Sequence, residues 1–203
     1  YHFAFLVVSI AFLGYGSAGA FLSGMKKIHQ KKRENLLAAT ALVFSFSILL
    51  SFLLCNAIPF DLFKLSWSRT HVLYLFLYYL LLSIPFFFAG IIISFAITRA
   101  AGMVSTIYFF DLLGAGAGSL LSILIFLPMG DKGVFLILSS LVLLAALLFC
   151  PQKSWKIKLP ILLLLAVEIV LFLWSPSWLA FRISEFKALP VSLHYPQAKH
   201  LQT

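Results

Sequence analysis

The chain has 203 residues, of which 63% are hydrophobic and 10% are charged. Soluble domains are about 45–50% apolar and about 25% charged, so this composition excludes a soluble globular domain and indicates a membrane protein. Its 15 basic and 6 acidic residues lie mostly in short tracts between apolar runs, which favours the lipid bilayer as their partner and argues against nucleic acid.

Apolar runs of membrane-spanning length follow one another along the chain. Only helices and closed barrels satisfy every backbone polar group in lipid, and none of the runs alternates as barrel strands do. We therefore expect an all-α, polytopic transmembrane helical bundle over residues 1–175. Its six membrane-spanning helices should lie near residues 3–24, 36–58, 72–98, 103–127, 133–149 and 159–174. Proline follows the second, fourth and fifth runs, and Pro85 should kink the third helix.

The loops differ in their content of lysine and arginine, which sets the orientation of a membrane protein. Five basic residues lie in the loop from Lys26 to Arg33, one is Arg99, and three lie from Lys153 to Lys158, against three in the other loops. We expect the first group to be cytoplasmic, with Tyr1 and the tail from Pro176 outside. The predicted location is the cytoplasmic (inner) membrane of a prokaryote.

Glycines are regularly spaced in the first and fourth predicted helices. Residues 14–19 match the G-x-G-x-x-G spacing of a dinucleotide-binding loop, but they lie inside a continuous apolar run that no βαβ unit follows. Helix packing explains them better, because small residues repeated every four positions form a smooth stripe that a neighbouring helix can approach. The predicted stripes are Gly16, Ala20 and Gly24 in the first helix and Gly114, Gly118 and Ser122 in the fourth.

Two acidic residues, Asp111 and Glu168, lie inside predicted spans. An acid in that position is costly and usually faces a bundle interior or a cavity. At about 1.5 Å per residue, Asp111 lies roughly 12 Å and Glu168 roughly 14 Å from the cytoplasmic starts of their helices. This shared depth makes them a candidate intramembrane polar site. Either each acid is protonated or hydrogen-bonded to serine, tyrosine or backbone, or the two form a coupled proton or cation site.

The sequence predicts no catalytic, cofactor-binding or metal-binding residues in this chain. Cys55 and Cys150 lie near the ends of apolar runs without metal-ligand spacing, and the five histidines fall in or beside loops. We therefore expect neither a cofactor nor a metal here.

Several segments together resemble a known family: His2 to Ser9 running into Gly14 to Gly19, then Pro85 to Gly90, then Tyr108 to Ala115. They are similar to the membrane portion of the spermidine-synthase-like (polyamine aminopropyltransferase-like) integral membrane proteins. In that family a multi-span helical region precedes a soluble domain of the spermidine synthase fold. Ser184 to Pro196 resembles the stretch that leads into that domain. The resemblance implies a parent protein that transfers an aminopropyl group from decarboxylated S-adenosylmethionine to a diamine such as putrescine, or one that does related chemistry on a similar ligand.

The resemblance carries no catalytic residue into this chain, because the family's nucleotide site and catalytic acids belong to the soluble domain. Residues 176–203 form a polar tail, which predicts a covalent C-terminal soluble domain of the parent protein beyond Thr203.

Three functions remain open at this point. The first is a membrane module that anchors an aminopropyltransferase-type catalytic domain and handles polyamine or a related ligand. The second is a transporter or channel subunit with a mid-membrane proton or cation site at Asp111 and Glu168. The third is a purely structural anchor, in which the acids can be replaced without loss.

Overall fold

The computed structural model describes residues 2–24, 33–60, 64–65, 68–99, 101–151 and 154–174. Its elements are α1 (His2–Gly24), α2 (Arg33–Ala57), α3 (Arg69–Arg99), the short 3-10 helix η3 (Ala101–Met103), α4 (Val104–Phe149) and α5 (Trp155–Trp174). No strand occurs in these ranges, so the predicted all-α fold class is confirmed. The predicted loop at Lys26 and the predicted tail from Pro176 lie outside the described residues.

The helices coincide with the predicted spans. Five stretches are long and apolar enough to cross a membrane, and a sixth, Gly133–Phe149, is apolar but shorter. The fourth and fifth predicted spans are the two halves of α4, which turns at Gly130 with φ 65° and ψ −163°. Glycine reaches a positive φ without steric cost, and Pro128 just before it lacks a backbone donor. α4 therefore doubles back and consists of a helix of spanning length, which we call its first half (residues 104–130), and a shorter apolar one, its second half (residues 133–149).

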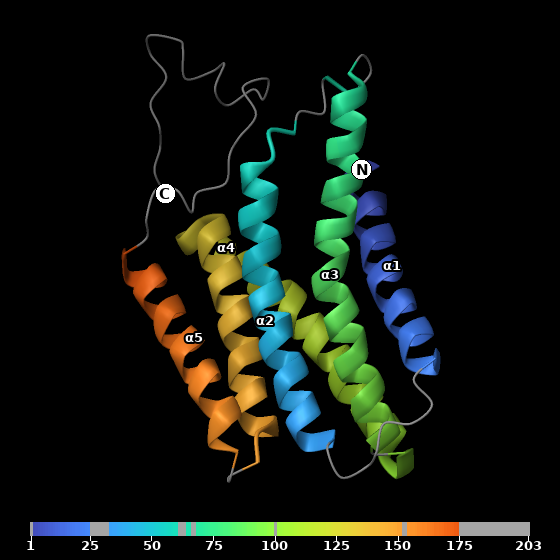
Figure 1. Ribbon diagram of the computed structural model, residues 1–203, viewed down its shortest axis with the longest axis vertical. Coiled ribbons are helices and arrows are strands. Elements are labelled where there is room, and N and C mark those ends of the chain that lie inside the picture. Colours follow the sequence, from blue (N-terminus) through green and yellow to red (C-terminus); the bar gives the residue numbers. More distant parts are fainter. Residues whose placement is uncertain are drawn as a thin grey trace.

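The helices stand side by side, and their direction alternates along the chain, so that the neighbours α1 and α3 run parallel. Figure 1 shows the order α1, α3, α2, second half of α4 and α5 across the view, with the first half of α4 passing behind α3 and α2. α1 and α3 end, and α2 and α5 begin, at the lower end of this view. The helix ends that flank the three predicted basic segments therefore lie at one end of the bundle.

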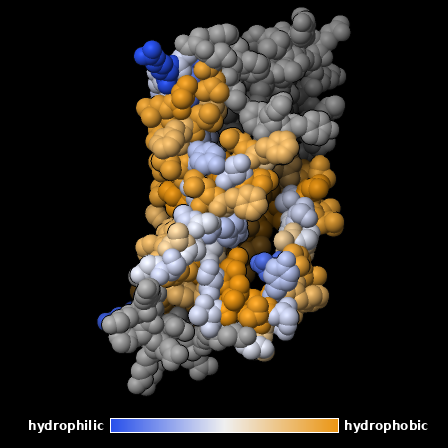
Figure 2. All heavy atoms as spheres, turned by 90° about the vertical axis from the view of Figure 1, so that its right-hand side faces the viewer, coloured by the Kyte–Doolittle hydropathy of each residue, from blue (hydrophilic) through white to orange (hydrophobic). Residues whose placement is uncertain are grey.

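Apolar side chains face outward over most of the bundle, the reverse of a soluble protein. Leu148 is 87% exposed, Leu173 78% and Phe5 74%, and Figure 2 shows hydrophobic residues spread over one side of the molecule. Among the described residues, the buried polar side chains are five serines and Glu168. Such a surface suits hydrocarbon and not water, so the chain is an integral membrane protein.

Small residues bring α1 and α3 together. A Cβ atom at Gly14 of α1 would collide with Phe86 Cβ and would lie 2.7 Å from the Ser83 carbonyl oxygen of α3. A Cβ atom at Gly90 of α3 would lie 2.8 Å from Ala18 Cβ of α1. The missing side chains at the two glycines are therefore what allows the backbones to approach this closely.

The small-residue stripes predicted from the sequence do not make this contact. Five residues of these stripes are exposed: Gly16, Ala20, Gly24, Gly114 and Gly118. Within the described chain, a Cβ atom added at any of the four glycines would meet nothing within 4 Å. On α1 the four-residue spacing is right, but the contact falls two residues earlier than predicted. Two residues are about 200° around a helix, so the predicted stripe lies on nearly the opposite face.

Pro85 lies inside α3, which continues through it as one helix. Because proline has no N–H, the Leu81 carbonyl four residues earlier loses its helical partner. Ser51 of α2 takes that place, since its Oγ donates a hydrogen bond to the Leu81 carbonyl at 2.8 Å. A serine of the neighbouring helix thus satisfies the carbonyl that the proline leaves open.

We predict that Gly14→Ala lowers the free energy of unfolding by about 1–3 kcal/mol, the usual cost of overpacking a tight contact. The new Cβ atom would meet the backbone of α3, which cannot move away as a side chain can. Gly16→Ala is the matched control, since the same change on the same helix meets nothing within 4 Å. Thermal unfolding in detergent measures both variants, and equal stabilities would contradict the α1–α3 contact.

A second prediction concerns the serine beside the proline. Ser51→Ala should cost about 1 kcal/mol, because it leaves the Leu81 carbonyl without a donor. In a Pro85→Ala background residue 85 regains its N–H, so the same change should cost clearly less. A double-mutant cycle of unfolding free energies measures this coupling. Ser47→Ala, which removes only a bond to the Phe44 carbonyl of its own helix, should show no coupling to Pro85.

Candidate functional site

Glu168 is buried where three helices meet, and it is 1% exposed. Its Oε1 accepts hydrogen bonds from Ser139 Oγ at 2.5 Å and from Ser45 Oγ at 3.4 Å, and its Oε2 accepts one from Ser140 Oγ at 2.7 Å. The Oγ atoms of Ser45 and Ser139 are also hydrogen-bonded, 2.7 Å apart. We call these four residues the Glu168 cluster. α2 supplies Ser45, the second half of α4 supplies Ser139 and Ser140, and α5 supplies the acid.

Apolar groups close the cluster on both sides along the bundle. On one side Ala41 of α2, Leu143 of α4 and Ile161 of α5 form a buried group. On the other side Phe52 of α2 packs on Leu136 of α4. These positions precede and follow the cluster by one to two helical turns, so they share its faces. The carboxyl therefore lies in a polar layer between two apolar layers.

The serines can satisfy the carboxyl in either protonation state. When Glu168 is ionised, Ser139 and Ser140 donate to its two oxygens, and Ser45 donates to Ser139 Oγ. When Oε1 carries a proton, it donates to Ser139 Oγ, and the Ser139 hydroxyl turns to the Ser45 carbonyl at 3.2 Å. A serine hydroxyl donates one hydrogen bond and rotates to suit its partner. The exchange between the two states needs no movement of the helices.

A groove between α4 and α5 reaches this cluster from the outside of the bundle. It has a volume of about 220 Å³. Its lining consists of Leu136, Ile137, Ser140, Glu168, Ile169, Phe172 and Leu173. Only Ser140 and the acid are polar, so the groove presents one carboxyl and one hydroxyl within apolar walls. The groove therefore extends from the outside of the bundle to the layer that holds the carboxyl.

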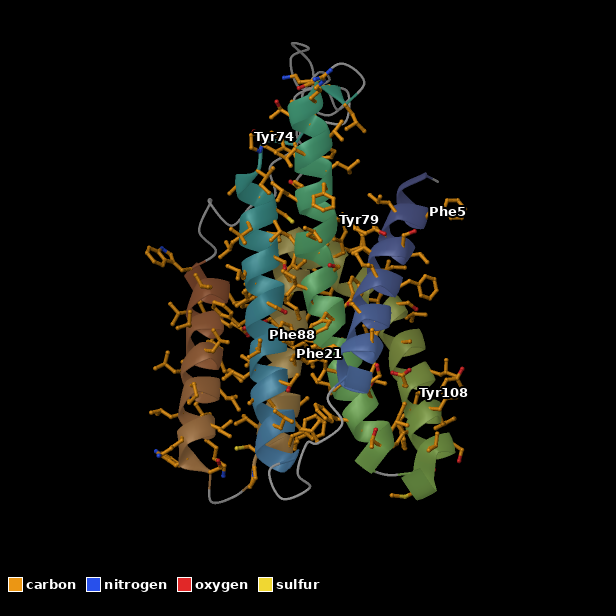
Figure 3. All side chains as sticks on the ribbon, turned by 45° about the vertical axis from the view of Figure 1, so that its right-hand side comes forward. Phe5, Phe21, Tyr74, Tyr79, Phe88 and Tyr108 are labelled. Atoms are coloured by element: carbon orange, nitrogen blue, oxygen red, sulfur yellow. The ribbon has the colours of Figure 1, made fainter. Side chains whose placement is uncertain are left out.

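Asp111, the other predicted site residue, lies elsewhere. It is exposed on the first half of α4, and Figure 3 shows Tyr108, one turn before it, on the opposite side of the bundle from α5. Because α5 begins at Trp155 and not near residue 159, Glu168 lies roughly 20 Å along its helix and Asp111 roughly 11 Å along its own. The structure does not bring the two acids together, so the predicted shared interior is not found.

The three serines of the cluster were not predicted from the sequence. Serines are common in membrane helices and often bond to their own helix, as Ser47 does to the Phe44 carbonyl, so a single serine carries little signal. The sequence feature that could have indicated the cluster is the pair Ser139 and Ser140, two adjacent serines in an otherwise apolar run.

The described residues contain no group of three or more His, Cys, Asp or Glu side chains that could hold a metal ion. Comparison of the chain with protein-family models, curated proteins and solved structures finds no match. The functional inference therefore depends on the Glu168 cluster and its groove.

We predict that the two acids act independently. Glu168→Leu should lower the free energy of unfolding by about 1–3 kcal/mol, because it takes the acceptor from buried serine hydroxyls. Asp111→Asn should change it little, because its side chain is exposed. The double variant should equal the sum within about 0.5 kcal/mol, as for residues without shared partners. Thermal unfolding of the four proteins measures the coupling, and a larger interaction energy would show that the acids do communicate.

Proposed function

We propose that this chain is a proton-binding membrane module of the kind used by proton-coupled carriers, with Glu168 as the group that takes up and releases the proton. The observation that carries the proposal is a buried carboxyl, held by three serines, that also lines a groove open to the outside of the bundle. A carboxyl that only joined helices would need the serines but not the groove. Acids at membrane depth typically mark proton or ion paths.

A proton fits the cluster better than a metal ion does. The oxygens of Ser139, Ser45 and the acid are in direct hydrogen-bond contact, at 2.5 Å and 2.7 Å. An ion such as Ca²⁺ holds six to eight oxygens at about 2.3–2.6 Å, so it would have to push these atoms apart and find more ligands. A proton needs only the rotation of hydroxyl groups.

The other hypotheses from the sequence remain separate proposals. The membrane module of a spermidine-synthase-like protein is supported by the resembling segments, and the Glu168 cluster neither adds to nor removes that support. A purely structural anchor would use the acid only to join α2, α4 and α5. The location we propose is the inner membrane of a prokaryote, with the basic loops in the cytoplasm, supported by the distribution of lysine and arginine.

The proposal predicts a carboxyl group that changes its protonation state while the protein stays folded. In lipid nanodiscs, infrared difference spectra between mildly acidic and alkaline pH should show a protonated-carboxyl band that is lost at alkaline pH. Glu168→Gln should remove this band, whereas the control Asp111→Asn should keep it. A band that persists in Glu168→Gln, or a wild-type protein without a titrating band, would exclude this role for Glu168.

A further inference from the structure

We propose that the groove between α4 and α5 binds a small amine with one apolar arm, held by its ammonium group on Glu168. This inference rests on the proposed function, since both require a carboxyl that exchanges its proton. It adds a ligand class and a route of entry. Both the ligand class and the route of entry are inferred from the lining and the volume of the groove.

The two oxygens of the carboxyl have different surroundings. Oε1 accepts hydrogen bonds from Ser139 and Ser45, which are both fully buried. Oε2 accepts one from Ser140, which is partly exposed and lines the groove. A carboxylate oxygen can accept two hydrogen bonds. Ser140 occupies one of these positions on Oε2, so this oxygen can accept one more hydrogen bond.

The polar atoms of the groove match an ammonium group with few N–H donors. One N–H can meet Oε2 and a second can meet Ser140 Oγ, which keeps a free lone pair while it donates to the acid. Further donors would face apolar side chains and remain unsatisfied, which is costly in a medium without water. The groove therefore favours a secondary or tertiary amine over a primary one.

The size and walls of the groove limit the rest of the ligand. About 220 Å³ holds about seven heavy atoms if each takes roughly the 30 Å³ of a water molecule. The arm of the ligand would lie against Ile137, Ile169 and Phe172, so it must be apolar. A diamine would place its second charge among these side chains without a partner.

The mouth of the groove opens toward the lipid-facing surface. Leu173 is 78% exposed and Ile169 is 50% exposed at its edge. The neutral acid can carry its proton on either oxygen, and a neutral amine that enters from the bilayer accepts it from Oε2, which is hydrogen-bonded to the groove-lining Ser140. The O–H bond of the carboxyl breaks and an N–H bond forms, which leaves a carboxylate and an ammonium with no change in net charge. The resulting charge-assisted hydrogen bond is stronger than a neutral one.

The test uses the full chain in lipid nanodiscs at neutral pH and two probes of equal shape and size, N-methylpentylamine and methyl pentyl ether. The amine should raise the unfolding temperature and bind at least about tenfold more tightly than the ether, a difference of about 1.4 kcal/mol. A third probe, 1,4-diaminobutane, should bind more weakly than N-methylpentylamine. Equal binding of amine and ether, or tighter binding of the diamine, overturns the proposal.

Variants of the groove separate this inference from the proposed function. Ile169→Trp fills the groove and should weaken amine binding at least about tenfold. Val170→Trp makes the same change at a residue that is 57% exposed and is not part of the lining, so amine binding should persist. Ser140→Ala is a smaller change that should also weaken it, by removing one acceptor. Ile169→Trp and Val170→Trp keep Glu168 and all three serines of its cluster, so both should keep the titrating carboxyl band.

The two measurements together identify which idea fails. Loss of amine binding in Ile169→Trp with the band retained supports the amine site. A wild-type protein that shows the titrating band and binds no amine overturns the amine site and leaves the proton-binding proposal. The absence of a titrating band overturns both.

Discussion

Hydrocarbon offers no hydrogen-bond partner, so each polar group of a spanning helix must find one within the protein. Many serines of this chain meet that need locally, as Ser47 does by donating to the Phe44 carbonyl of its own helix. Where the local partner is missing, another helix supplies it. Ser51 serves the carbonyl beside Pro85, and Glu168 gathers hydroxyls from α2 and α4. Interhelical bonds of this kind stabilise membrane bundles by about 0.6–2 kcal/mol each.

The consequence is that α2 organises the bundle. Toward α3 it offers Ser51, and its Cys55 carbonyl accepts a hydrogen bond from Tyr78 at 2.5 Å. That bond occupies one of the carbonyls that every helix leaves open at its C-terminus. Toward α4 and α5 it offers Ala41 and Ser45. α2 thus lies between the pair α1 and α3, which it contacts through α3, and the site-bearing pair of α5 and the second half of α4.

The helical fold and its crossings could be predicted from the sequence because bilayer length and hydropathy act on every residue of a span. The contact faces could not be predicted in the same way. Gly14 and Gly16 are equally small and lie in the same apolar helix, and only the position of Phe86 on α3 decides which of them packs. The sequence singles out acids by their cost in lipid, which identified Glu168. The sequence does not show which side chains form hydrogen bonds with the acid, because the three serines lie 28, 29 and 123 residues away from it along the chain.

The same limit explains why Asp111 was predicted to share a site with Glu168. The depth of each acid in the membrane was predicted from its distance along the helix. A helix that begins earlier or runs obliquely places the acid at another depth without any change in composition. The first half of α4 crosses behind its neighbours in Figure 1, and its residues are mostly exposed. The arrangement of the helices, which no local pattern encodes, therefore places the segments that carry these two acids on opposite sides of the bundle.

The second half of α4 is unusually short for a crossing. Its 17 residues, Gly133–Phe149, extend about 25 Å, whereas the hydrocarbon core is about 30 Å thick. The turn at Gly130 has no loop that could lengthen it, and thinning of the bilayer is one way to accommodate such a short segment, at a cost of fractions of a kcal/mol per Å. Ser139 and Ser140 lie on this segment, and Ser140 lines the groove. Hydrophobic mismatch thus links the thickness of the surrounding membrane to the geometry around Glu168, and lipids with shorter acyl chains match this part of the protein best.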